Sequence, residues 1–159
     1  MRSFKGVDLK TTQNLRKQFP QLIDRLCDDG FNYDSRVCIF DHFLNAQEAV
    51  ELMDKVSLEE RTKRDASWHK FYEAIVNNFD IFIIKYAREK LIFKSPRNNS
   101  LAIKRLDLME SAGYISFVIP VLDLYYEQGW DATHIVYYQE PNKLECLKSI
   151  VKESGLYWL

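Results

Sequence analysis

Histidines and cysteines are the side chains that most often bind metals or act as nucleophiles, and this chain of 159 residues holds three of each. No Cys-x-x-Cys or His-x-x-x-His pair occurs among them. A structural zinc site usually contains at least one such close pair, so the spacing argues against bound zinc. A cysteine nucleophile needs a histidine beside it in the fold, and the sequence singles out no such pair. The residues concerned are Cys27, Cys38, Cys146, His42, His69 and His134.

Glycine spacing tests for phosphate-binding loops, in which the backbone approaches a ligand without an intervening Cβ atom. The five glycines are isolated along the chain, so neither a P-loop nor a dinucleotide fingerprint is present. The acidic stretch 28–34 does not fit an EF-hand calcium loop, because the first ligand position would be Arg25. We therefore expect a protein that is not an enzyme and has no cofactor and no metal. An enzyme whose site is assembled from scattered residues is one alternative.

The composition is that of one globular domain spanning residues 1–159, with 47% hydrophobic and 28% charged residues. The longest aliphatic and aromatic run, 81–84, is far shorter than the roughly 20 residues of a membrane span. The N-terminal residues lack the apolar segment of a signal peptide. An odd number of cysteines without paired spacing is typical of a reducing compartment. These features predict a cytoplasmic protein that does not contact a membrane.

Charge is distributed in blocks, although the formal net charge is only −1. The acidic blocks are 20–60 and 106–159, and the basic blocks are 1–19 and 61–105. Blocks of this kind often become faces of opposite sign that steer charged partners, and the alternative is mutual neutralisation within the fold. Because block 61–105 mixes bases with aromatic residues, a regulatory protein associated with nucleic acid is a second alternative function. The isoelectric point near 6.3 argues against it.

Apolar spacing predicts helices over most of the first two thirds of the chain. The first lies over 11–26, where Pro20 either kinks it or starts a second helix. A capping box formed by Asn45 and Glu48 starts the next. For residues 68–86 we prefer one long helix, and the alternative is a helix ending near Asn78 followed by a strand.

The last third has a different pattern. A loop at 95–100 and a helix ending at Gly113 lead to strands predicted at 115–121 and 133–138, which form a hairpin. A final helix, capped by Asn142 and Glu145, precedes a short strand at 156–159. The predicted fold class is α+β, with helical N-terminal two thirds packed on a C-terminal ββα(β) unit that contains a small antiparallel sheet.

The C-terminal third combines a net charge of −5 with several Tyr and Trp residues. Neighbours in a strand point to opposite faces, so about half of these rings are expected at the surface beside carboxylates. Exposed Tyr and Trp surrounded by charge are typical of a protein-binding surface. The alternative is that the helical layer and edge packing cover most of the rings. The residues expected to bind a protein are Asp123, Tyr126, Glu127, Trp130, Asp131, Tyr138 and Glu140.

In its Tyr and Phe content, acidic segments and lack of a catalytic motif, the chain resembles the immunity proteins that protect bacteria from contact-dependent and other polymorphic toxins. The resemblance is carried by overall character and by the last 45 residues, including the stretches 131–134, 137–138 and 155–157. It implies an inhibitor that binds one cognate toxin domain, often a basic nuclease, and buries its active site or substrate groove. Acidic side chains would then stand in for substrate phosphates, and charge would speed association.

Overall fold

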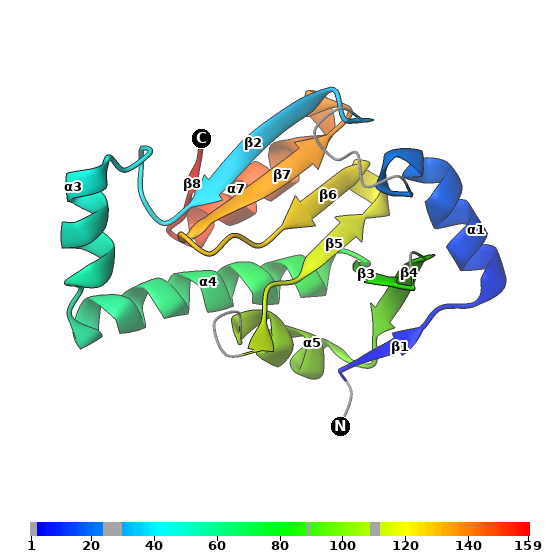
Figure 1. The fold of residues 1–159 in the computed structure, drawn as a ribbon, viewed down its shortest axis with the longest axis horizontal. Helices are drawn as coiled ribbons and strands as arrows, with labels where there is room; N and C mark the ends of the chain where they lie inside the picture. The colour runs from blue at the N-terminus through cyan, green and yellow to red at the C-terminus, as the bar shows by residue number, and fades with distance from the viewer. Residues whose placement is uncertain (1–2, 24–29, 89, 109–111) are drawn as a thin grey trace.

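The computed structural model describes residues 3–23, 30–88, 90–108 and 112–159, and at its centre lies an eight-stranded antiparallel sheet (Figure 1). The order across the sheet is β1-β4-β3-β5-β6-β7-β2-β8. The strands are β1 (Phe4–Gly6), β2 (Tyr33–Cys38), β3 (Phe82–Ala87), β4 (Lys90–Pro96), β5 (Ser116–Ile119), β6 (Leu124–Glu127), β7 (Thr133–Tyr138) and β8 (Tyr157–Trp158).

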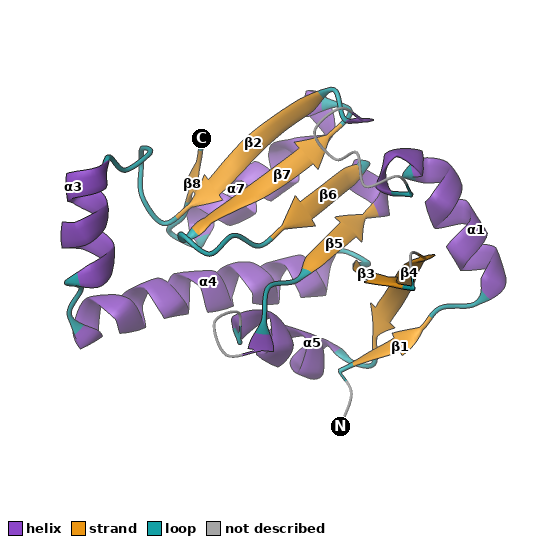
Figure 2. Cartoon of the chain, viewed as in Figure 1, coloured by secondary structure: helices purple, strands orange, loops and turns teal. Residues whose placement is uncertain are grey.

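Helices lie on both sides of this sheet (Figure 2). One face packs against α4, α5 and α7, and the other packs against α1 and η1. The α-helices are α1 (Leu9–Gln18), α3 (Ala46–Ala49), α4 (Leu58–Asn78), α5 (Asn99–Asp107) and α7 (Glu145–Glu153). The shorter turns are η1 (Pro20–Leu22), η2 (Val50–Asp54, a π-helical turn), η3 (Pro120–Leu122) and η4 (Pro141–Leu144).

Two hydrophobic cores result from this arrangement. On the first face, Phe117 and Tyr126 pack with Phe71 of α4. On the second face, Tyr125 and Phe19 belong to the other core. Since successive strand residues alternate between faces, covering both faces buries both members of an adjacent pair such as Tyr125 and Tyr126.

The predicted fold class is wrong in how it distributes helices and strands. Four strands, β1 to β4, come from the N-terminal two thirds and join the C-terminal strands in one large sheet. The preferred long helix over 68–86 is also wrong, because α4 ends at Asn78 and β3 begins at Phe82, as the alternative proposed. The run Ile81–Ile84 lacks alternation because β3 is buried on both faces, with Ile83 in one core and Ile84 in the other.

Several local predictions are confirmed. Asn45 with Glu48 forms a capping box with both reciprocal hydrogen bonds. Of the two alternatives at Pro20, the structure has a new start rather than a kink, in the form of the short turn η1. The strand at 133–138 has the predicted bounds. Tyr157 and Trp158 form the short final strand.

Other local predictions are corrected. The expected hairpin is a three-stranded meander, because Pro120 starts the turn η3 and the chain returns as β6 before β7. The turn η4 precedes the last helix, whose N-terminus at Leu144 lacks a side-chain cap among the described residues, so Asn142 and Glu145 do not cap it. In the loop predicted at 95–100, Ser95 and Pro96 extend β4 instead.

Helix α4 extends beyond the sheet, and this extension positions the surface described below. Its buried residues begin only at Trp68, so the turns from Leu58 to Ser67 project past the end of the strands. In Figure 1, α3 stands apart from the sheet beside this projecting half of α4. Among the described residues, none of the helices is both long and apolar enough to cross a membrane.

Candidate functional site

The structure separates the three aromatic residues that were expected to lie at one surface. Tyr126 is 0% exposed and Tyr138 is 8% exposed, because α4 and α7 cover that face of the sheet. The expected exposure of these two rings is therefore corrected: they pack in the core and cannot touch a partner in this conformation. Trp130 is 78% exposed, in the loop that joins β6 to β7.

Two of the expected acidic residues are held by a lysine of the same chain. Lys143 forms ion pairs with Asp123 and with Glu140, the latter at 2.9 Å, and Gln18 also donates a hydrogen bond to Asp123. Burial opposes the charge on Asp123, but the Lys143 ammonium and the Gln18 amide outweigh it and lower the pKa of the carboxyl. These contacts tie η3 to α1 and η4, so Asp123 has a structural role.

The other two acidic residues lie at the ends of the β6–β7 loop. Tyr125 Oη donates a hydrogen bond of 3.4 Å to Glu127. Asp131 accepts a hydrogen bond of 3.1 Å from the backbone N–H of Thr133 and so shapes the loop that carries Trp130. Of the seven predicted residues, the structure leaves Trp130 and Asp131 together at one surface.

Opposite this loop stands a short helical arm, residues 41–56, which the sequence analysis did not single out as a site. Residues 41–54 contain four carboxylates and no lysine or arginine. In the described part of the chain, neither a lysine nor an arginine pairs with any of these carboxylates. Phe43 is 65% exposed and Val50 is 43% exposed on the same arm. The carboxylates are those of Asp41, Glu48, Glu51 and Asp54.

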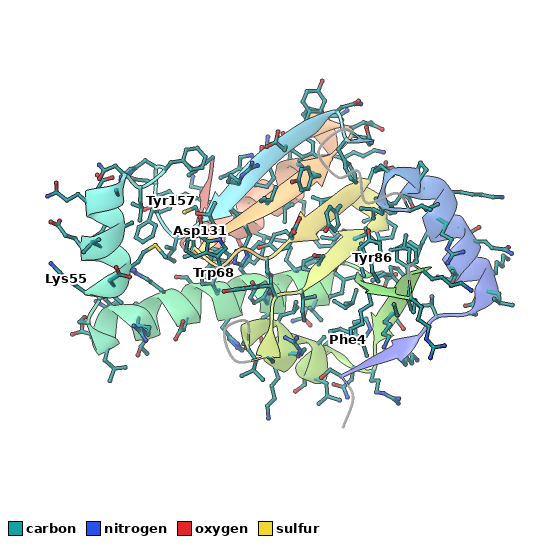
Figure 3. The ribbon with its side chains drawn as sticks, in the orientation of Figure 1. Phe4, Lys55, Trp68, Tyr86, Asp131 and Tyr157 are labelled. Carbon is teal, nitrogen blue, oxygen red and sulfur yellow. The ribbon has the colours of Figure 1, made fainter. Side chains whose placement is uncertain are left out.

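A groove of about 460 Å³ separates the arm from the end of the sheet. Figure 3 shows Asp131 on the sheet side of this space and Lys55 on the far side of the arm. The lining combines apolar arm residues with the ends of β2 and β7 and the loop between β6 and β7. Residues that line the groove include Phe43, Val50, Met53, Cys38, Trp130 and Asp131.

Arg64 fastens the arm to α4. Its Nη1 donates a hydrogen bond of 2.5 Å to the carbonyl of Leu52, and its Nε donates one of 3.0 Å to Glu60. Its guanidinium also lies over the ring of Phe40, 4.9 Å from the centroid. Sequence reasoning counted Arg64 only as part of the basic block, since nothing local to α4 indicates that it reaches back to the arm.

The cysteine and histidine side chains near the groove have well-defined surroundings. Cys38 Sγ lies 3.3 Å from Thr133 Oγ1 and 3.4 Å from the backbone N–H of Phe40, which donates to it. His134 is fully buried, and this burial lowers its pKa to about 3, so its ring is neutral at physiological pH. On the arm, the Asp41 carboxylate raises the pKa of His42, as Glu48 does more weakly. Within the described ranges, His, Cys, Asp and Glu do not gather in a group of three or more that could hold a metal.

The basic block 61–105 does not form one continuous face. On α4, Lys63 pairs with Glu59 and Arg64 pairs with Glu60. Three further cations gather at a different pocket, on the other side of the molecule; they are Lys85, Lys94 and Arg105. Comparison with protein-family models, curated proteins and solved structures found no match to this chain.

Proposed function

We propose that this protein is a non-catalytic binding protein that holds a basic protein domain between its arm and the Trp130 loop. The form of this function suggested by the resemblance to immunity proteins is the neutralisation of a cognate toxin. The observation that carries the proposal is the acidic arm with exposed apolar side chains, whose carboxylates pair with neither lysine nor arginine among the described residues and which faces an exposed tryptophan across a groove.

The apolar residues supply the expected binding energy. Binding hot spots are rich in Trp and lie in pockets that become fully desolvated. Trp130 and Phe43 offer large rings that rotate about only two side-chain bonds each, so binding would cost them little conformational entropy. Val50 and Met53 supply further apolar surface in the same groove. A partner side chain that entered the groove would bury these four residues together.

The carboxylates determine the charge of the expected partner. Asp41, Glu48, Glu51 and Asp54 outnumber Lys55, so the arm, residues 41–56, has a formal net charge of −3, which His42 reduces further only when protonated. Such a surface attracts a cationic protein and speeds the encounter at low salt. A nuclease domain has the required basic character, because it must bind phosphates. Within the described ranges Cys38 and Cys146 are free thiols, which suits a reducing cytoplasm as the site of action.

The direct test is calorimetric titration with a basic, toxin-like domain encoded beside the gene of this protein. We expect a one-to-one complex that Trp130→Ala weakens at least tenfold and that the double reversal Asp41→Lys/Glu51→Lys weakens further, mainly through slower association. Matched controls are Leu9→Ala, an exposed apolar residue on α1, and Glu153→Lys on α7.

Three outcomes would contradict the proposal. The first is the absence of a complex with the neighbouring basic domain. The second is a complex whose affinity changes equally in the arm variants and the controls, which would place the interface elsewhere. The third is salt-dependent binding of generic DNA or RNA without a protein partner, which would support the nucleic-acid alternative.

A further inference from the structure

A second pocket, of about 540 Å³, lies at the opposite end of the sheet from the arm. It is formed where β1, β4, β3 and the residues leading into β5 meet α5. In Figure 3, Phe4 marks this side of the molecule, far from Asp131 and Lys55. Its volume lies within the range of small-molecule sites, roughly 300–1,000 Å³. Residues that line it include Phe4, Ile83, Lys85, Lys94, Arg105 and Tyr114.

The register of β3 and β4 places two lysines close together on one face. Lys94 pairs directly with Ile83, and Lys85 pairs with Ile92. Since residues two apart share a face, Lys85 and Lys94 are diagonal neighbours, whose Cα atoms are typically about 7–8 Å apart. Both side chains therefore extend from the same face of the sheet, beside the pocket that they line.

Arg105 adds a third positive charge that is held in place. Its Nη2 donates hydrogen bonds to the carbonyls of Ala112 and Gly113, at 2.6 and 3.0 Å. Its Nη1 is buried and has no hydrogen-bond partner among the described residues. Burial also lowers the pKa of this guanidinium. A buried donor without a partner is unfavourable, and more so when it is charged.

Carboxylates do not offset these charges within the described part of the chain. Lys85, Lys94 and Arg105 form none of the ion pairs found there, whereas Lys63, Arg64, Lys143 and Lys148 each pair with an acid. Apart from Ser3, the rest of the lining is apolar or aromatic and includes Phe4, Ile83, Ile115 and Tyr114, which is 48% exposed.

We infer that this pocket binds a small phosphorylated ligand, with the phosphate between Lys85, Lys94 and Arg105 and an apolar or planar group against Phe4 and Tyr114. Three convergent cations are typical partners of a phosphate dianion, and arginine donors bind it with charge-assisted hydrogen bonds. The isolated glycines do not conflict with this site, because side chains rather than a backbone loop would hold the phosphate. The same chemistry could come from a free nucleotide or from the 5′-phosphate end of a nucleic acid.

Titration calorimetry with four probes tests the inference and separates these two sources. The probes are inorganic phosphate, adenosine 5′-monophosphate, and a short DNA strand with and without a 5′-phosphate. We expect the 5′-monophosphate to bind more tightly than inorganic phosphate, because its base adds contact with the aromatic side chains. Binding of the phosphorylated strand in preference to both small probes would assign the site to nucleic-acid ends and would uphold the phosphate pocket.

The decisive variant is Lys85→Gln/Lys94→Gln, which keeps both side-chain stems. We expect it to weaken binding of the preferred probe at least tenfold, because two of the three cations that line the pocket are removed. The matched control, Lys90→Gln/Lys104→Gln, makes the same change of net charge at exposed residues that do not line the pocket.

Absence of binding by all four probes at millimolar concentration would overturn the inference, as would equal weakening in the two double variants. Equal affinity for the DNA strand with and without its 5′-phosphate would also overturn it, because generic backbone contact would then explain binding. Trp130→Ala should leave phosphate binding unchanged, so this site and the proposed protein-binding surface can fail independently.

Discussion

The indole of Trp68 stacks on the imidazole of His134, with ring centroids 4.0 Å apart and planes inclined by 17°. This contact joins α4 to β7 at the point where the helix leaves the sheet and projects toward the arm. On its other side, Nδ1 of His134 shares a hydrogen bond of 2.5 Å with the Tyr126 hydroxyl, and the Tyr72 hydroxyl lies 3.4 Å away. His134, Tyr126 and Tyr72 thus form a buried polar cluster that, together with Trp68, holds α4 against β7.

The first prediction concerns pH and His134. Its pKa is about 3 in the folded protein and about 6.5 in an unfolded chain, so between these values only the unfolded chain binds the proton. Stability should therefore fall as pH falls below 6.5, by up to about 1.4 kcal/mol per pH unit from this residue. Urea unfolding at pH 7 and pH 5 should show a loss about 2 kcal/mol smaller in His134→Gln than in the unmodified protein.

The exposed His69 should change the pH dependence of stability in the opposite direction to His134. The Asp107 carboxylate raises the pKa of His69, so that interaction stabilises the fold below pH 6.5 and is lost as pH rises through the raised pKa. Because His69 is largely exposed, solvent screening keeps this effect small. His69→Gln is the control, and a pH response in His134→Gln equal to that of the unmodified protein would refute the assignment.

The second prediction distinguishes core from surface tyrosines. Tyr126→Phe removes a buried hydroxyl and leaves Nδ1 of His134 with only the longer contact to Tyr72. We expect a loss of about 1–3 kcal/mol in the free energy of unfolding, because a buried polar group loses its partner. Tyr157→Phe, at a half-exposed ring, should change it by less than about 0.5 kcal/mol. Similar values for the two variants would argue against the buried cluster.

The third prediction concerns Asp123, which has a left-handed backbone with a φ of 49°. Asp123→Ala removes the contacts with Lys143 and Gln18 and places alanine where that conformation is costly, so we expect a loss of about 1–3 kcal/mol. Asp123→Asn should lose less, because asparagine tolerates the backbone and still accepts a hydrogen bond. Thermal or urea unfolding measures both, and a larger loss in Asp123→Asn would contradict the structural role.

The fourth prediction tests the attachment of the arm. Arg64→Gln should remove the hydrogen bond to the Leu52 carbonyl and the contact with Phe40. Amide hydrogen exchange over residues 41–56 should then accelerate at least tenfold, which corresponds to about 1.4 kcal/mol of local stability. Lys63→Gln is the matched control, since its partner Glu59 lies on the same helix and is exposed. Unchanged exchange in Arg64→Gln would show that the arm is held by other contacts.

The proposed partner sites could be predicted only in part from sequence. Trp130 and Asp131 were expected at a binding surface, and they lie together beside the groove. The arm was recognised as a capped helix but not as a site, because its groove forms against β2 and β7, which are distant in sequence. The basic pocket was hidden within a charge block, since only the β3–β4 register brings Lys85 beside Lys94.

The sequence by itself determined those features whose causes are local. The capping box that Asn45 forms with Glu48 depends on a few neighbouring residues, whereas at Pro20 the sequence left two alternatives open. The tertiary structure alone decided that residues 82–87 form a strand and that Tyr126 and Tyr138 are buried. The reason is that burial depends on which distant segments cover a surface. A second helical layer over the sheet cannot be deduced from the alternation of side chains within one strand.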